Sequence, residues 1–246
     1  MEKTAQAESI GVSEQERVEG LGRWYLDEQL DFDKKLVEFK YRTLKPYFQG
    51  PEALELGPGD GQMTRLLVHD FSRLTVVEGS ATLLASIAAH ANLLKVQALF
   101  EEFTPSQKFN TIIMAHILEH IDDPVGLLRR AGDWLAAGGK ILAAVPNANS
   151  FHRLAAVKMG LLARPDELNA RDHAVGHRRV YDPASFRRDF AAAGLRVLAA
   201  GGVFCKPLSN QQIEDHWTPA MIEGFYQLGK DFPDYGADIY LVGATT

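Results

Sequence analysis

A glycine-rich turn between an apolar run and a helical pattern constrains the fold of this chain more than any other feature. The turn reads Gly57-Pro58-Gly59-Asp60-Gly61 and directly follows the apolar segment 53–56. Apolar residues at helical spacing begin behind it, at Met63. Glycines adopt positive φ and leave room beside the backbone, and the first amides of the next helix point toward a ligand there. The order strand, turn, helix therefore predicts the ligand-binding edge of a doubly wound sheet.

The spacing of the glycines separates this turn from the dinucleotide-binding pattern. That pattern is G-x-G-x-x-G, whereas this chain has G-x-G-x-G, preceded by Glu55. The motif E-x-G-x-G-x-G resembles the first motif of class I S-adenosylmethionine-dependent methyltransferases. The resemblance implies that Gly57, Gly59 and Gly61 pack against the methionine part of the cofactor and that Glu55 helps to hold its amino group. A nucleotide-binding oxidoreductase stays open as a different class, although the spacing disfavours it.

A second acid follows the next apolar segment. Residues 74–77 end in Glu78, which is followed by Gly79 and Ser80. In a parallel sheet, an acid at this strand end lies beside the glycine turn and can accept hydrogen bonds from both ribose hydroxyls. The run V-V-E-G-S resembles the family's second motif and implies that Glu78 and Gly79 bind the cofactor. The alternative is a solvated acid at the end of a strand.

The segment after the third predicted strand departs from the family pattern. Many relatives carry an acid that binds the adenine amino group where this chain has Leu99. Adenine recognition is therefore expected from backbone groups of Leu99 and Phe100, with Glu101 as a side-chain partner.

A strongly apolar run over 109–115 predicts a central parallel strand, buried on both faces. It leads into L-E-H followed by D-P, which resembles the fourth motif of small-molecule class I methyltransferases and implies that Ala115 and His116 border the cofactor. A helix is expected to begin at Pro124 and to end at the glycine pair 138–139.

The same stretch is formally a metal motif. His116-Ile117-Leu118-Glu119-His120 reads H-x-x-E-H, an inverted zinc-peptidase signature. Such a site needs both histidines on one face of a helix and a third ligand from elsewhere. The buried strand before the motif and the helix start after it make a long helix improbable, so no metal is expected.

The fold predicted from these motifs is α/β and Rossmann-like. A doubly wound, seven-stranded mixed sheet with helices on both faces is expected, its last strand over 239–242 lying antiparallel between strands five and six, as the family topology implies. Residues 1–246 form one domain: a helical lid over 1–48, a cofactor-binding core over 49–146, and substrate-covering segments with the last strands over 147–246. The resemblance implies that an aromatic residue of the lid meets the methionine end, and Tyr25 is the candidate.

Two irregular excursions, 147–181 and 206–234, are long for plain connections, and such segments are often functional. They hold polar and aromatic residues that the core does not need: Asn147, His152, His173, His177, Arg178, Tyr181, Lys206, Asn210 and Trp217. Together they suggest a small polar acceptor, such as a sugar or natural-product intermediate, with an anionic one suggested by the arginines. For a general base, His120 is favoured over His177 because it ends the fourth motif.

Composition limits the remaining classes. The formal charge is −6 over 246 residues, which argues against a general nucleic-acid binder. Cys205 is the single cysteine, so no intrachain disulfide can form, and it is expected to be buried in a strand of a cytoplasmic protein. No apolar run approaches the roughly 18 residues of a membrane span.

The cofactor expected from the resemblance is S-adenosylmethionine, leaving as S-adenosylhomocysteine, and the partner is a small methyl acceptor. Oxygen or nitrogen as the methylated atom and a homodimer are left open. Methylation of a protein or nucleic acid and a non-catalytic cofactor-binding regulator are the alternatives. Residues 145–147 read V-P-N, whereas the motif N/D-P-P-Y/F is common in methyltransferases that act on an amino group of a base or of glutamine. The sequence therefore disfavours such amino groups as methyl acceptors.

Overall fold

A seven-stranded mixed sheet organises the computed structural model, which describes residues 13–27 and 31–245. The strand order is β3-β2-β1-β4-β5-β7-β6, with β1 to β5 parallel and β7 antiparallel to both β5 and β6. The predicted topology is therefore confirmed, including the place of the last strand. The strands are β1 Glu52–Leu56, β2 Arg73–Glu78, β3 Leu93–Gln97, β4 Phe109–Ala115, β5 Leu135–Pro146, β6 Leu195–Val203 and β7 Asp238–Thr245.

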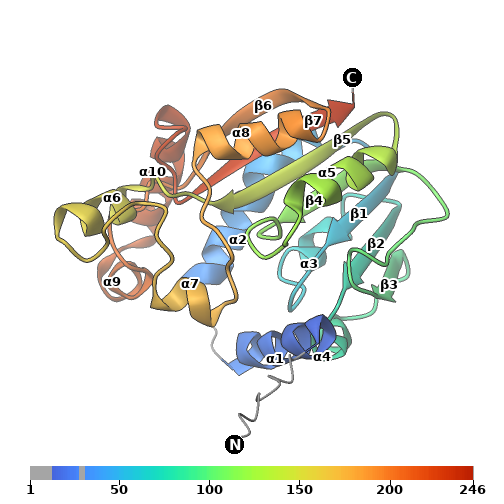
Figure 1. Cartoon of the computed structure of the whole chain (residues 1–246), viewed down its shortest axis with the longest axis horizontal. Helices are drawn as coiled ribbons and strands as arrows, with labels where there is room; N and C mark the ends of the chain where they lie inside the picture. Colours follow the sequence, from blue (N-terminus) through green and yellow to red (C-terminus); the bar gives the residue numbers. More distant parts are fainter. Residues whose placement is uncertain (1–12, 28–30, 246) are drawn as a thin grey trace, which may run out of the picture.

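Helices cover both faces of this sheet (Figure 1). Because neighbouring strand residues point to opposite faces, Leu54 and Ile112 enter one core with α5 and α8, while Ala53 and Ile113 enter the other with α3. The connecting helices are α3 Thr64–Leu67, α4 Ala81–Ser86, α5 Pro124–Asp133 and α8 Pro183–Ala192.

The predicted end of α5 at the glycine pair is wrong. The helix begins as expected, with the Asp123 carboxylate accepting a hydrogen bond from the Gly126 amide, but it ends at Asp133. The chain then enters β5 at once, because Leu135 pairs with Phe109 and is buried there. The glycines lie in the irregular start of β5, where Gly138 has a φ of +73°.

The N-terminal segment forms two helices on different sides of the carboxyl edge of the sheet. Helix α1 (Glu14–Asp27) lies beside α4 (Figure 1), and Gln15 of α1 donates a hydrogen bond of 2.8 Å to the Gly79 carbonyl. Helix α2 (Asp31–Leu44), followed by the short helix η1 (Lys45–Tyr47), packs Phe39 against Phe204 and Tyr226. The predicted lid is therefore held at the second-strand motif.

The two excursions contain four helices, which gather beyond the carboxyl ends of β4 and β5 (Figure 1). They are α6 Phe151–Lys158, α7 Ala170–Ala174, α9 Asn210–His216 and α10 Pro219–Asp231. The second excursion holds two helices because the chain breaks between α9 and α10, where Thr218 caps a new helix that starts with Pro219. No helix in the described part of the chain has the length and apolar character needed to cross a membrane.

Candidate active site

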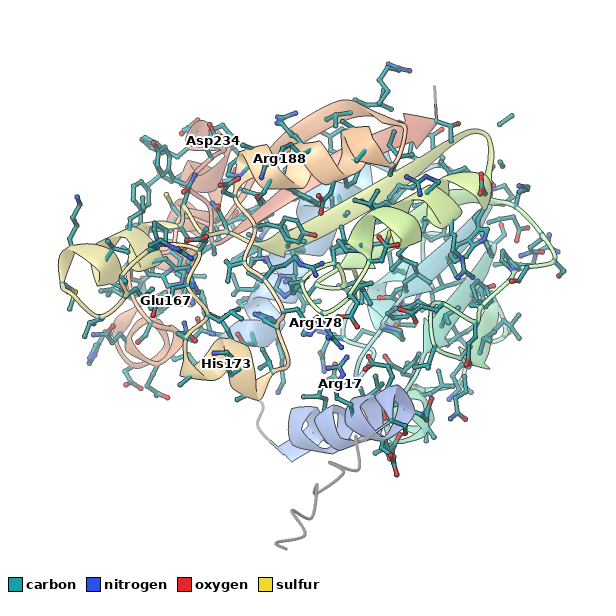
Figure 2. All side chains as sticks on the ribbon, in the orientation of Figure 1. Arg17, Glu167, His173, Arg178, Arg188 and Asp234 are labelled. Carbon is teal, nitrogen blue, oxygen red and sulfur yellow. The ribbon has the colours of Figure 1, made fainter. Side chains whose placement is uncertain are left out.

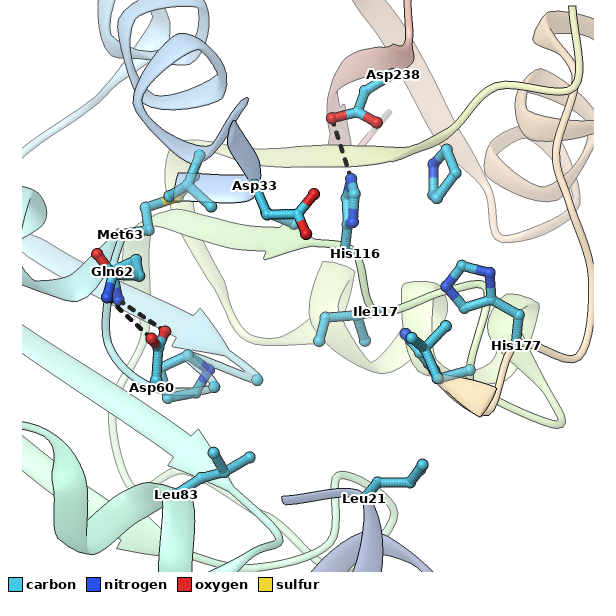
Figure 3. A pocket seen from close by; sticks show the side chains of 18 of the residues that line it. Leu21, Asp33, Asp60, Gln62, Met63, Leu83, His116, Ile117, His177 and Asp238 are labelled. Carbon is cyan, nitrogen blue, oxygen red and sulfur yellow. Dashed lines mark hydrogen bonds and ion pairs between the residues drawn. The ribbon is translucent and has the colours of Figure 1, made fainter. Parts of the chain in front are cut away.

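A cavity of about 460 Å³ opens at the carboxyl edge of the parallel strands (Figure 3). The predicted residues that line it are Glu55, Gly57, Gly59, Glu78, Gly79, Leu99, Phe100, Glu101, Ala115, His116, His120 and His177. Tyr25 falls in α1, but its side chain lies outside the described part of the structure. The predicted acceptor residues Asn147, His152, Lys206 and Asn210 line the same cavity. One continuous space therefore joins the two halves of the predicted site.

The glycine turn presents its backbone to this cavity. Gly57, Gly59 and Gly61 all have positive φ, at +62°, +58° and +82°. A Cβ at Gly57 would lie 2.1 Å from Cδ1 of Ile117, whereas a Cβ at Gly59 would meet nothing within 4 Å and would enter open space. Gly61 does not line the cavity; its amide donates to the Pro58 carbonyl and closes the turn. Gly59 is therefore the glycine that leaves room for a ligand.

Glu78 is held at the edge of this space by the backbone. Its carboxylate accepts hydrogen bonds from the amides of Ser80 (2.9 Å) and Gly59 (3.3 Å). Burial raises the pKa of Glu78, and these amide donors oppose the shift. A fixed carboxylate that can still accept further hydrogen bonds suits a pair of ligand hydroxyls.

Glu55 lies behind the turn, almost fully buried. Thr64 donates a hydrogen bond of 2.7 Å to Oε2 of its carboxylate. Burial raises the pKa of Glu55 to about 7; Thr64 opposes this shift and the charge of Glu78 adds to it. A cationic amino group bound here would reverse the shift, because an opposite charge favours the ionised carboxylate. The residues thus fit a ligand with an ammonium group and a diol.

The backbone hydrogen bonds around Leu99 limit which of the groups expected to bind adenine are available. Its carbonyl already accepts hydrogen bonds from the amides of Glu102 and Phe103, at 3.0 and 3.1 Å. The amides of Leu99 and Phe100 are therefore better candidates for recognising a ring than the Leu99 carbonyl.

His116, the first residue of the formal metal motif, makes its closest contacts outside that motif, and its Nδ1 lies 3.7 Å from Oε1 of Glu119. It has a φ of +60°, a region that non-glycine residues rarely adopt, and its Nε2 lies 3.1 Å from Asp238 and 3.0 Å from Lys40. Figure 3 shows the His116–Asp238 contact. Lys40 and Asp238 also pair directly at 3.0 Å, both nearly fully buried. Burial alone would raise the pKa of Asp238, but Lys40 and His116 outweigh it and hold that pKa well below its usual range.

A second buried cluster places His177 against a carboxylate. Nδ1 of His177 lies 2.9 Å from Asp172, whose other oxygen accepts hydrogen bonds from Arg153 (3.0 Å) and from the Asn169 amide (2.9 Å). Burial alone would raise the pKa of Asp172, but His177, Asn169 and Arg153 lower it to about 2. An ionised Asp172 favours the tautomer with the proton on Nδ1, which leaves Nε2 of His177 as a hydrogen-bond acceptor.

His120 occupies a different environment, although its ring centroid lies 4.8 Å from that of His177. Its Nδ1 is 3.3 Å from the Gly176 carbonyl. Burial, together with the neighbouring histidines His177 and His116, lowers the pKa of His120 to about 3. The histidine favoured from sequence is therefore a weaker base here than an ordinary histidine.

Glu119, His120 and His177 are the described residues that could hold a metal ion, with ligand atoms within 4.8 Å of one another. Ligand atoms around a tetrahedral zinc ion are roughly 3.4 Å apart, so binding would need the side chains to draw together. The two histidines of the H-x-x-E-H motif therefore do not come together as metal ligands. His116 contacts Asp238 instead, and His177 takes its place in the cluster with Glu119 and His120.

Several predicted acceptor residues have structural roles. Arg178 pairs with Asp122 and, at 3.3 Å, with Glu14 of α1, so it ties the N-terminal helix to the first excursion. Figure 2 shows Arg178 on the first excursion, facing α1. Tyr181 is buried against Phe186, Trp217 packs on Phe225, and neither they nor His173 line the cavity.

Sequence reasoning missed Lys40, Arg153, Asp172 and Asp238, which line the cavity and hold its histidines. Asp172 stands five residues before His177, a local signal that could have paired them. Lys40 and Asp238 carry no such signal, because they lie 198 residues apart.

Comparison with known proteins identifies the family to which the chain belongs. Residues 27–200, well over half of the chain, match the family model described as a methyltransferase domain. The chain belongs to this methyltransferase family. Its members use S-adenosylmethionine, and the protein is an S-adenosylmethionine-dependent methyltransferase of class I.

Relatives of this methyltransferase are distant. The ubiquinone biosynthesis O-methyltransferase of Aeromonas salmonicida is 24% identical over 170 residues, which cover 66% of this chain and 70% of the relative. Among solved structures, a complex of DhpI with SAM and HEP matches with a TM-score of 0.62 and 16% identity over 96% of this chain and 99% of that one. The CcbJ methyltransferase of Streptomyces caelestis matches with a TM-score of 0.61 and 16% identity, covering 93% and 97%. These structural matches show the shared fold.

Proposed function

We propose that this methyltransferase transfers the methyl group of S-adenosylmethionine to a hydroxyl of a small polar metabolite. The observation that carries the proposal is the single cavity lined both by the glycine turn and by the Asp172–His177 pair. The naming of its relatives as O-methyltransferases supports oxygen over nitrogen as the acceptor atom.

The cofactor half has residues suited to each polar part of S-adenosylmethionine. Glu78 would accept hydrogen bonds from the ribose hydroxyls, Glu55 would hold the amino group, and the open side of Gly59 would admit the methionine part. When bound, the cofactor supplies a methyl group already activated by the sulfonium. The residues of the chain therefore mainly bind and align the two reactants.

His177 is the base that we assign to the acceptor half. A hydroxyl must lose its proton as it is methylated, and histidine is suited to take that proton near neutral pH. Asp172 fixes the ring through Nδ1 and would stabilise the imidazolium that forms when Nε2 accepts the proton. His120 is less suited because burial lowers its pKa to about 3. This assignment reverses the order favoured from the sequence.

The enclosure of the cavity supports a small acceptor. Helix α1 covers the cofactor half and is tied to Gly79 by Gln15 and to Arg178 by Glu14. The excursions close the other half, where Asn147, His152 and Lys206 line the wall.

The proposal is tested by measuring S-adenosylhomocysteine release with a panel of sugars, hydroxy acids and phenols. With an accepted substrate, His177→Ala should lower the rate roughly 10²–10⁴-fold and leave cofactor affinity unchanged, because only the proton acceptor is lost. His120→Ala should have a smaller effect, and the exposed His90→Ala serves as the matched control.

Two results would contradict the proposal. A wild-type rate in His177→Ala would mean that the acceptor needs no base, as for an amine. Tight cofactor binding without turnover on any member of the panel would favour a cofactor-binding regulator.

A further inference from the structure

The end of the cavity beside Lys206 and Asn210 of the second excursion holds a group of polar side chains that the methyl transfer does not use. Lys206, His152, Asn210, Asp33 and Arg171 all line the cavity there. The backbone amide of His152 donates to the Lys206 carbonyl at 3.1 Å, which joins the start of α6 to the segment before α9. We propose that Lys206, His152 and Asn210 bind an anionic group, a carboxylate or a phosphate, with a neighbouring hydroxyl on the methyl acceptor. This inference rests on the proposed methyl transfer and narrows its substrate class.

Lys206 is the centre of this anion subsite. Its ammonium makes no hydrogen bond or ion pair with the described residues, although it lines a cavity and is mostly covered. Burial lowers its pKa to about 8; the carboxylates of Asp33 and Asp238 oppose that shift, and Arg171 adds to it. A cation kept in such a place without a partner is costly unless a ligand supplies the counter-charge.

The two nearby carboxylates are already paired. Asp33 accepts hydrogen bonds from Arg171 (2.8 Å) and from the Asn210 amide group (2.5 Å). Asp238 pairs with Lys40 at 3.0 Å and with His116 at 3.1 Å. Both carboxylates therefore act on Lys206 only from a distance, and neither makes an ion pair with it.

The ion pairs beside Lys206 give the same result. Lys40 pairs with Asp238, Arg171 with Asp33, and Arg153 with Asp172. Lys206 alone among these seven described residues makes no ion pair, so this group carries one unpaired positive charge. The excess positive charge favours an anionic ligand over a neutral or cationic one.

His152 and Asn210 supply unpaired polar atoms beside this charge. Nδ1 of His152 and Oδ1 of Asn210 are buried and have no hydrogen-bond partner among the described residues. Burial lowers the pKa of His152 to about 3, and the charges of Lys206 and Arg153 add to this effect, so the ring is neutral and can donate one hydrogen bond to an anion. Oδ1 of Asn210 can only accept, so it requires a donor such as a hydroxyl. Because buried polar atoms are normally satisfied, a ligand with both an anionic oxygen and a hydroxyl matches this subsite.

The experiment uses protein saturated with S-adenosylhomocysteine, which occupies the cofactor half and keeps the probes out of it. Glucuronate, glucose 6-phosphate and glucose are titrated by calorimetry into the wild type. At least one anionic probe should bind, and glucose should bind at least roughly tenfold more weakly, because it lacks the charge. The two anionic arms tell a carboxylate from a phosphate.

Variants then test whether Lys206 is the partner. Lys206→Met should lower the affinity for the anionic probe at least roughly tenfold, to a value near the affinity for glucose. Lys108→Met is the matched control, because Lys108 is exposed and precedes the amino end of β4, at the opposite edge of the sheet. Thermal unfolding checks that the variants fold. If Lys206→Met does not fold, Lys206→Gln replaces it in the same titration.

Three outcomes would overturn the inference: equal binding of glucose and the anions, unchanged anion affinity in the Lys206 variants, or no binding of either anion to the saturated wild type. The initial titration with S-adenosylhomocysteine is read separately. If that titration fails, the proposed methyl transfer is contradicted, whereas a failed anion titration on saturated protein contradicts the anion subsite alone.

Discussion

The cofactor half of the cavity is built from segments that follow one another in the chain, whereas the acceptor half joins segments that are far apart. Around the glycine turn, Glu55 and Glu78 come from two adjacent strands, and the backbone amides of Gly59 and Ser80 hold Glu78. In the acceptor half, buried ion pairs such as Lys40–Asp238 join residues up to 198 positions apart. Backbone geometry therefore positions one half, and side-chain charge pairing positions the other.

Breaking one of those pairs should have the largest effect on stability. Lys40→Met leaves Asp238 buried with His116 as its remaining partner and should lower the free energy of unfolding by about 3–5 kcal/mol. The affinity of the folded variant for S-adenosylhomocysteine should change much less, because Glu78 and the glycine turn do not depend on this pair. Denaturant unfolding and calorimetry measure the two quantities.

The matched control lies on the same helix. Lys35 pairs with Glu38 on the surface, with both side chains exposed, so Lys35→Met should cost at most about 1 kcal/mol. Equal losses for the two variants would show that the buried pair does not hold the acceptor half together.

This difference explains how much the sequence could predict. The glycine turn and Glu78 follow from local motifs, since hydrophobic runs and glycines report backbone conformation directly, whereas the order of the sheet follows from the family resemblance that those motifs carry. The pairing of Lys40 with Asp238, or of Asp33 with Arg171, depends on how α2 meets the two excursions, and no local pattern encodes that. His120 was preferred to His177 for a similar reason: its motif is visible in the sequence, while its burial is not.

A smaller, pH-dependent effect should distinguish Glu119 from the buried carboxylates that accept hydrogen bonds. Glu119 is fully buried without a hydrogen bond to its side chain, and burial raises its pKa from 4.5 to about 8. Because the folded state holds this proton more tightly, the resulting stability is fully present below pH 4.5 and is lost as the pH rises through about 8.

The glutamine of Glu119→Gln cannot ionise, so the variant should not lose stability as the pH rises through about 8. Relative to the wild type, the variant should gain up to a few kcal/mol above pH 8 and nothing near pH 4. The exposed Glu102→Gln should leave the pH profile of unfolding unchanged. A Glu119→Gln profile parallel to that of the wild type would mean that Glu119 stays ionised in the folded protein, with His116, whose Nδ1 lies 3.7 Å from Oε1, as its partner.

Calorimetric titration with S-adenosylhomocysteine tests the central claim most directly, namely that the glycine turn and Glu78 form the cofactor site. The wild type should bind with roughly micromolar affinity, about 8 kcal/mol. Glu78→Ala should bind at least roughly tenfold more weakly, because two hydrogen bonds to a charged acceptor are lost, while Glu52→Ala, at the amino end of β1, should bind as the wild type does. No binding by the wild type, or equal binding by Glu78→Ala, would contradict this assignment of the cofactor site.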